Sequence, residues 1–81
     1  LLAYQQDWQQ FVTFFQNYLG FPLTLQELKK LKLIDLRAWL ADRHTQEFHA
    51  RSTARSLSGV KSFITFLQQE SLLDHHPIFH I

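Results

Sequence analysis

The chain of 81 residues contains no cysteine, only two glycines and only two prolines. The absence of cysteine excludes a disulfide framework and thiolate chemistry, and it permits a cytosolic setting. So few turn-forming residues argue against an all-β fold. No apolar run approaches the roughly 18 residues of a membrane span, and no stretch resembles a signal peptide. Since 46% of the residues are hydrophobic, the chain is too apolar for disorder, and we expect one soluble, helical domain.

The chain also lacks the common catalytic motifs. It has no glycine-rich phosphate loop, no H-E-x-x-H and no G-x-S-x-G, and its carboxylates are scattered singly. His75, His76 and His80 suggest a metal site, but no cysteine or suitably placed carboxylate completes a tetrahedral set of ligands. We therefore predict no catalytic residue, no metal, no cofactor and no small-molecule ligand.

Positive charge is concentrated in one part of the chain. Residues 1–28 contain no lysine or arginine, whereas the segment from Lys29 to Lys61 holds all eight basic residues against three acidic ones, a formal charge of +5. Such a segment indicates an anionic partner, with nucleic acid as the first candidate and a membrane surface as the second.

An aromatic stripe marks the first predicted helix, from about Leu2 to Leu19. Gly20 provides a stop, and Pro22 prevents the helix from resuming at once. The face opposite the stripe is rich in glutamine and includes Gln5 and Gln6, which can hydrogen-bond adenine edges but are also ordinary surface residues. The stripe recurs at spacings of three and four residues, as in a helix that faces a core: Tyr4, Trp8, Phe11, Val12, Phe15, Tyr18 and Leu19.

Two shorter helices are predicted at residues 25–31 and 33–43. The T-x-x-E sequence from Thr24 to Glu27 is typical of a capping box that begins the first of them, and Asp35 is favourably placed in the first turn of the second. Residues 44–50 are polar and without periodicity, which predicts a loop. Where the two helices join, three lysines form either a phosphate contact or a solvated turn: Lys29, Lys30 and Lys32.

The longest predicted helix, from Arg51 to Glu70, has two opposed faces. Its apolar face consists of Ala54, Leu57, Val60, Phe63, Ile64 and Leu67. The other face has no acidic residue before Glu70 and carries Arg51, Arg55, Ser58, Ser62 and Thr65, with Lys61 on its flank. Such a face suits phosphate oxygens and base edges, but it is equally typical of a solvated helix surface.

The ends of this helix and its partner surface can also be predicted. Ser52 or Thr53 can serve as the N-cap, and Gly59 suggests a close helix crossing or a kink. After the helix, we expect residues 72 and 73 to fold back on the core and Pro77 to lead into extended chain. The aromatic stripe should pack on the apolar face in one buried cluster: Trp8, Phe11, Phe15, Trp39, Leu57, Ile64 and Leu67.

Three motifs occur in one order across nearly the whole chain. STARSLSGVKSFITFLQQESLLDHHP is similar to S-x-x-R-x-L-S-x-x-R-x-F-x-x-F-L followed by a turn and Asn-Pro, with Lys61 in place of Arg and His76 in place of Asn. The opening is similar to T-x-x-x-Y-x-x-D-L-x-x-F-x-x-F, through Tyr4, Asp7, Phe11 and Phe15. LKLIDLRAWLADR resembles L-T-x-x-D-L-R-x-F-L-A-x-R. Together the motifs resemble the N-terminal core-binding domain, SAM-like in fold, of tyrosine recombinases of the Xer and phage integrase type.

The resemblance implies an all-α orthogonal bundle of about four helices over residues 1–81. It also implies that the family's first helix and its C-terminal catalytic domain are missing, so that this fragment is not an enzyme although its parent chain is. Expected partners are double-stranded DNA and other recombinase protomers in a synaptic tetramer, with no membrane, in the bacterial cytoplasm in association with the nucleoid. Gln5 and Gln6 replace an Arg-Arg pair that is frequent in the family, and Lys32 replaces a Thr or Ser cap.

We accordingly predict a DNA-binding domain of a site-specific recombinase, acting in strand exchange and DNA integration. The alternative is a helical protein-interaction module whose basic face meets an acidic protein, and salt-dependent binding to duplex DNA separates the two hypotheses. A helix-turn-helix regulator is disfavoured because no turn of three or four residues precedes the basic helix. Chromosome dimer resolution and mobile-element integration both stay open. The predicted DNA-binding residues are Arg51, Ser52, Arg55, Ser58, Lys61, Ser62, Gln5 and Gln6.

Overall fold

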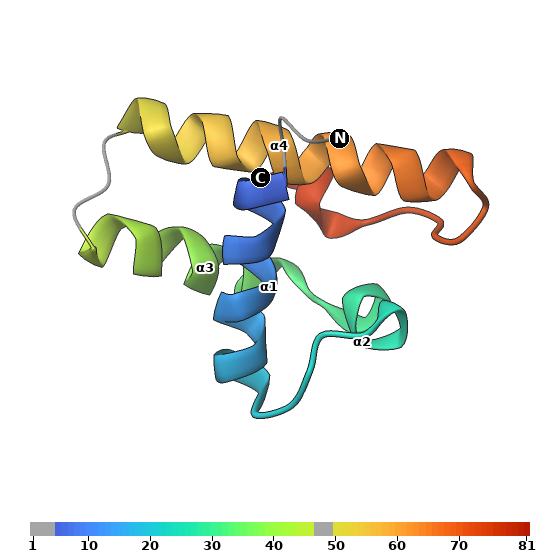
Figure 1. Ribbon diagram of the computed structural model, residues 1–81, viewed down its shortest axis with the longest axis horizontal. Coiled ribbons are helices and arrows are strands. Elements are labelled where there is room, and N and C mark those ends of the chain that lie inside the picture. Colours follow the sequence, from blue (N-terminus) through green and yellow to red (C-terminus); the bar gives the residue numbers. More distant parts are fainter. Residues whose placement is uncertain (1–4, 47–49) are drawn as a thin grey trace.

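A computed structural model describes residues 5–46 and 50–81, and within these ranges the chain is helical without any β-strand (Figure 1). The elements are α1 (Gln5–Leu19), α2 (Leu25–Lys30), α3 (Leu33–Thr45), α4 (Ala50–Gln69) and a short 3-10 helix, η2 (Pro77–His80). The predicted all-α class is confirmed, and the ends of α2, α3 and α4 differ from the predicted ends by one or two residues. Residues 2–4 of the first predicted helix and 47–49 of the predicted loop lie outside the described residues.

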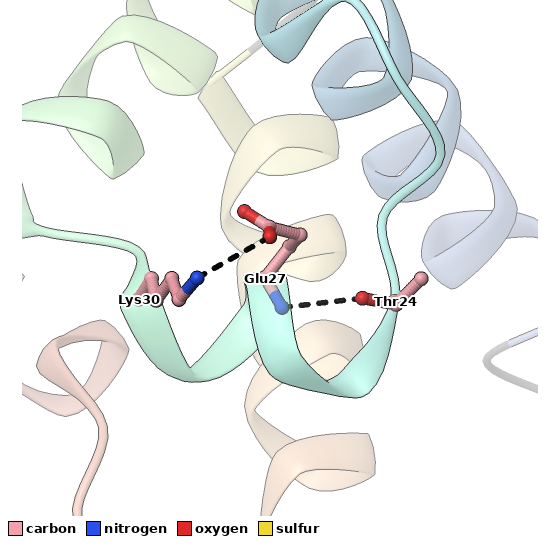
Figure 2. A network of polar contacts seen from close by, with 3 residues as sticks. All are labelled: Thr24, Glu27 and Lys30. Carbon is pink, nitrogen blue, oxygen red and sulfur yellow. Dashed lines mark hydrogen bonds and ion pairs between the residues drawn. The ribbon is translucent and has the colours of Figure 1, made fainter.

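Local hydrogen bonds explain where α2 and α3 begin. The Thr24 hydroxyl accepts a hydrogen bond from the backbone N–H of Glu27 at 3.3 Å, and the Glu27 carboxylate lies 3.6 Å from the ammonium of Lys30 (Figure 2). The predicted N-terminal cap of α2 is thereby confirmed. Lys32 precedes α3, and its backbone N–H donates to the Asp35 carboxylate at 2.8 Å. Asp35 therefore starts α3 although no Ser or Thr cap is present.

Glycine ends α1 as predicted. Gly20 has a φ of +84°, in the left-handed region, and its N–H donates to the carbonyl of Gln16 at 3.1 Å. Because Gly20 lacks a Cβ, this conformation costs little. The start of α4 differs from the prediction: the helix includes Ala50, so Ser52 and Thr53 lie inside its first turn and not at the cap.

The helix α1 crosses both α3 and α4, and the core lies where the three meet (Figure 1). Phe11 is fully buried there and meets the Trp39 ring edge-on at 5.0 Å between centroids. Five members of the predicted cluster are buried as expected, whereas Trp8 and Leu57 are only half-buried and pack against its side. The buried apolar residues are Phe11, Phe15, Leu28, Leu31, Leu36, Trp39, Val60, Ile64, Leu67, Leu73 and Ile78.

The apolar face of α4 is rotated relative to the prediction. Ala54, expected in the core, is exposed, while Ser56, which the periodicity left unassigned, is only 2% exposed. Gly59 is buried within the continuous helix. The rotation places Ser56 against α1, where it makes a polar contact that pattern reasoning based on apolar residues alone does not detect.

After α4 the chain reverses and runs back along the helix (Figure 1). Leu73 and Ile78 join the core, but Leu72, which was also expected to fold back, is 46% exposed. The predicted extended exit at Pro77 is wrong, because Pro77–His80 forms η2. The His76 ring accepts a hydrogen bond from the backbone N–H of Ile78 at 3.1 Å, and this bond starts the 3-10 turn.

Candidate nucleic-acid interface

The predicted DNA-binding residues lie on α4 and at the start of α1. On α4, Arg51, Arg55, Ser58 and Ser62 are exposed, and Ser52 and Lys61 are half-buried. Gln5 and Gln6 are exposed in the first turn of α1. The first turn of α4 contains no acidic residue, so its basic side chains and the positive end of its helix dipole act in the same direction.

Three of these residues come together where α1 crosses α4. Gln6, Ser52 and Arg55 line a hollow of about 150 Å³. Both elements are needed to form it, because Gln6 belongs to α1 and the other two to the first turns of α4. The structure does not bring the remaining five predicted residues into this hollow. They are Gln5, Arg51, Ser58, Lys61 and Ser62.

The floor of the hollow is a buried polar cluster. Asp7 and Ser56 are 8% and 2% exposed, and the Ser56 hydroxyl donates to Oδ1 of Asp7 at 3.0 Å. Nη1 of Arg43 donates to the side-chain oxygen of Gln10 at 3.0 Å. All four residues line the hollow. The cluster therefore ties α1 to α4 and to α3 through directional bonds at one place.

Arg43 supplies a buried positive charge to this cluster. Burial lowers the pKa of its guanidinium, while the charges of Asp7 and Asp42 raise it. The guanidinium carbon also lies 5.9 Å from the centroid of the Trp39 ring, within the range of a cation–π contact. Arg43 is thus held inside the domain by its bond to Gln10, the charges of Asp7 and Asp42 and the Trp39 ring.

The buried pair Asp7 and Ser56 escaped the sequence-based prediction of the site, although a signal for it exists. Asp7 precedes Phe11 and Phe15 at intervals of four residues, so it continues the buried stripe of α1. Ser56 likewise precedes Val60 and Ile64 at intervals of four on α4. A polar residue that extends an apolar stripe on each of two predicted helices indicates a buried polar pair between them.

A wider groove adjoins the hollow, between α1 and α3. It has a volume of about 760 Å³, and Gln6, Gln10 and Arg43 line both cavities. Side-chain amides supply most of its polar groups, from Gln6, Gln9, Gln10, Asn17 and Gln46. The glutamine face of α1 is therefore a concave, mainly uncharged surface continuous with the hollow beside Arg55, and its amides can donate and accept hydrogen bonds.

The lysines at the join of α2 and α3 form a separate group. Lys29, Lys30 and Lys32 are exposed, and Lys30 pairs with Glu27 at 3.6 Å. Figure 1 shows α2 far from the first turn of α4. The lysines consequently do not belong to the surface around the hollow.

Neither a metal cluster nor a membrane-spanning helix is found in residues 5–46 and 50–81. No three His, Cys, Asp or Glu side chains gather there in a metal-binding arrangement, and none of the helices in these ranges has the length and hydropathy to cross a membrane. His76 has a structural environment instead, since both of its ring nitrogens make hydrogen bonds to the backbone.

The chain belongs to the family of phage integrase N-terminal SAM-like domains, whose family model matches residues 1–71. Over all 81 residues it is 40% identical to the tyrosine recombinase XerC of Rickettsia prowazekii (strain Madrid E), covering 27% of that protein. It is also 38% identical to XerC of Brucella suis biovar 1 over 74 residues, which is 91% of this chain and 24% of the relative. The family resemblance found in the sequence is thereby confirmed.

The chain spans about a quarter of the length of the curated relatives it matches. The aligned part is the N-terminal domain of the family. The larger part of these recombinases, where the resemblance places the catalytic residues, therefore lies outside the 81 residues. No solved structure matches the chain significantly.

Proposed function

We propose that this chain is the DNA-binding domain of a site-specific tyrosine recombinase, which clamps duplex DNA during strand exchange and DNA integration. The observation that carries the proposal is the basic start of α4 at its crossing with α1, in a chain of this family. Other recombinase protomers in a synaptic tetramer are the further partners, and the setting is the bacterial cytoplasm at the nucleoid.

The exposed residues divide the work of binding between phosphates and bases. Arg51 and Arg55 lie one helical turn apart on the outer face of α4 and anchor phosphate oxygens. Ser58 and Ser62 continue that face with short hydroxyls, which let the helix backbone come close to the DNA. Gln5 and Gln6 offer amides to base edges from α1, as glutamine does with adenine. Binding by the 81 residues alone is expected to be weak, because the proposed clamp needs a second domain.

A salt titration tests this proposal. We expect fluorescence anisotropy with a short duplex to give log K falling with log salt at a slope of about −3 to −4.5, as for roughly three to five engaged basic side chains. Arg55→Ala should weaken binding and flatten the slope by about one unit, since it removes one phosphate contact. A slope near zero would contradict the proposal.

Charge reversal tests where the DNA binds. The double substitution Arg51→Glu and Arg55→Glu should abolish binding and leave the melting temperature nearly unchanged, because both side chains are exposed. Lys29→Glu with Lys30→Glu is the matched control, with the same change in net charge at the exposed join of α2 and α3. That control should retain most of the affinity. If the arginine variant binds like the parent chain, the basic face is solvated surface and the protein-interaction hypothesis takes its place.

A further inference from the structure

We propose that Asp7 and Ser56 are positioning residues for DNA contact. They hold the start of α4 against α1, so that Gln6, Ser52 and Arg55 surround one hollow that receives a backbone phosphate. This inference rests on the proposed DNA-binding function, and it assigns a positioning role to two buried residues in the lining of the hollow.

The first argument is the place of the bond between Asp7 and Ser56. Within residues 5–46 and 50–81 it is the one side-chain hydrogen bond that joins α1 to α4, at 3.0 Å, with both partners more than nine-tenths buried. Apolar packing tolerates small rotations of one helix on another, whereas a buried hydrogen bond fixes the rotation because breaking it leaves unsatisfied polar atoms. The bond also accounts for the rotated face of α4, since it turns Ser56 inward.

The second argument is what this rotation does to the neighbouring residues. Ser52 and Arg55 lie four residues and one residue before Ser56 on α4, and Gln6 is adjacent to Asp7 on α1. All three line the hollow. A turn of either helix would therefore move a hydroxyl, a guanidinium or an amide away from the others. The bond therefore sets the spacing of these three hydrogen-bond donors.

The third argument is the charge of the hollow. Its lining includes the guanidinium groups of Arg43 and Arg55 and the carboxylate of Asp7, so one positive charge is in excess. Asp7 acts electrostatically on the buried Arg43, whose pKa it raises, while Arg55 is exposed and faces solvent. An exposed guanidinium with a hydroxyl and an amide beside it forms a set of donors that suits a phosphate group.

Three variants of the 81-residue chain test the positioning role in the salt-dependent DNA assay. Ser56→Ala and Asp7→Ala each remove the bond, and we expect each to weaken binding about three- to tenfold, the effect of misplacing one charge-assisted contact. Asp7→Asn keeps an oxygen that accepts from Ser56 and removes a negative charge, so it should bind at least as tightly as the parent chain. If Asp7→Ala and Asp7→Asn tighten binding equally, only the charge matters and the positioning role is wrong.

A double-mutant cycle identifies the residue through which the pair acts. In a chain that already carries Arg55→Ala, Ser56→Ala should change the affinity by less than about twofold, because the misplaced contact is already gone. In a chain that carries Arg51→Ala, Ser56→Ala should weaken DNA binding as much as it does in the parent chain. Equal effects in the two backgrounds would overturn the inference.

A separate measurement shows whether each variant is folded. Circular dichroism melts give the folded fraction of every variant, and affinities are compared per folded molecule at a temperature well below each transition. An affinity per folded molecule that is unchanged in Ser56→Ala would show a purely structural role. If the parent chain itself shows no salt-dependent binding, the proposed function has failed, and that result is distinct from a failure of the cycle.

Discussion

His76 makes two hydrogen bonds that fix the protonation of its ring. The backbone N–H of Ile78 donates to Nδ1 at 3.1 Å, so Nδ1 carries no proton, and Nε2–H donates to the carbonyl of Leu28 at 2.9 Å. An asparagine can accept the same bond from Ile78 with its amide oxygen. This explains how His-Pro can replace the Asn-Pro that the family resemblance leads one to expect, with the difference that histidine titrates.

The stability of the domain should consequently depend on pH through His76. Burial lowers the pKa of the His76 imidazole, against a smaller raising effect of its bond to Leu28. As the pH falls through the ordinary histidine value of about 6.5, the unfolded chain takes up a proton that the folded chain does not, so the free energy of unfolding decreases. The contribution of neutral His76 to the free energy of unfolding is fully present above that value. It is lost progressively as the pH falls toward the lower pKa of the folded state.

The measurement is a series of urea melts between neutral and mildly acidic pH on the parent chain and on His76→Asn. The substitution should flatten the loss of stability on acidification while keeping an oxygen that accepts the bond from Ile78. His75→Asn is the matched control, because His75 is adjacent but exposed, and it should leave the acid dependence as it is. An equal acid dependence in His76→Asn and the parent would contradict this role of His76.

Phe15 tests the aromatic packing of α1 at the level of one side chain. It is fully buried and contacts the rings of Phe11, Phe14 and Tyr18 at 4.8, 4.9 and 5.7 Å between centroids. Phe15→Ala should lower the free energy of unfolding by about 3 to 5 kcal/mol, a large share of what a small domain possesses. A thermal melt unchanged by this substitution would contradict the packing of α1 against the other helices.

At the scale of the elements, substitutions at the C-terminal ends of α1 and α4 should change stability in opposite directions. Gly20 and Ser71 both have positive φ, +84° and 60°, at the C-terminal ends of these helices. A Cβ on Gly20 would meet no atom within 4 Å, so Gly20→Ala should destabilise through backbone strain alone, by about 1 kcal/mol. Ser71→Gly should stabilise by a similar or smaller amount for the same reason.

Paired melts of Gly20→Ala and Ser71→Gly provide the measurement, and each variant is the control for the other. Both substitutions lie at exposed positions, so packing changes little in either. Shifts of the melting temperature in the same direction would show that the left-handed conformation does not govern the two helix ends.

How much the sequence could predict differs from element to element. Apolar periodicity predicted the four helices, and the capping residues Thr24 and Gly20 predicted two of their ends, because these signals are local. The rotation of α4 was not predicted, because a count of apolar residues leaves out Ser56 even though it continues the spacing of Val60 and Ile64. The 3-10 turn of Pro77–His80 likewise begins at His76, whose ring also bonds to a carbonyl of α2.

The candidate site was likewise predicted in one part and missed in another. The basic face of α4 and the glutamine face of α1 were predicted from composition and spacing, and the structure brings Gln6, Ser52 and Arg55 of that set together. The polar floor was not predicted, because Asp7 and Ser56 are residue types that pattern reasoning assigns to the surface. Burial of such residues is decided by a partner on a different helix.

For the whole molecule, the distribution of charge matters more than its sum. The net charge is only +1, yet the arginines at the start of α4 and the lysines at the join of α2 and α3 occupy separate regions of a body that measures 35 × 27 × 22 Å (Figure 1). Exposed charges are screened over about 8 Å at physiological ionic strength. The two basic groups should therefore act independently, which is what makes the lysine double variant a fair control for the arginine one.

The placement of the two tryptophans gives the domain two optical reporters in different layers. Trp39 is 1% exposed in the centre of the core, so a quencher in the solvent should reach it only when the core opens. Trp8 is half-buried, follows Asp7 in the chain and stacks on Phe63 of α4 at 4.2 Å between ring centroids. Its fluorescence is therefore sensitive to how α1 sits on α4. A quencher in the solvent reaches Trp8 first, so movement at the helix crossing and global unfolding can be followed separately in one unlabelled molecule.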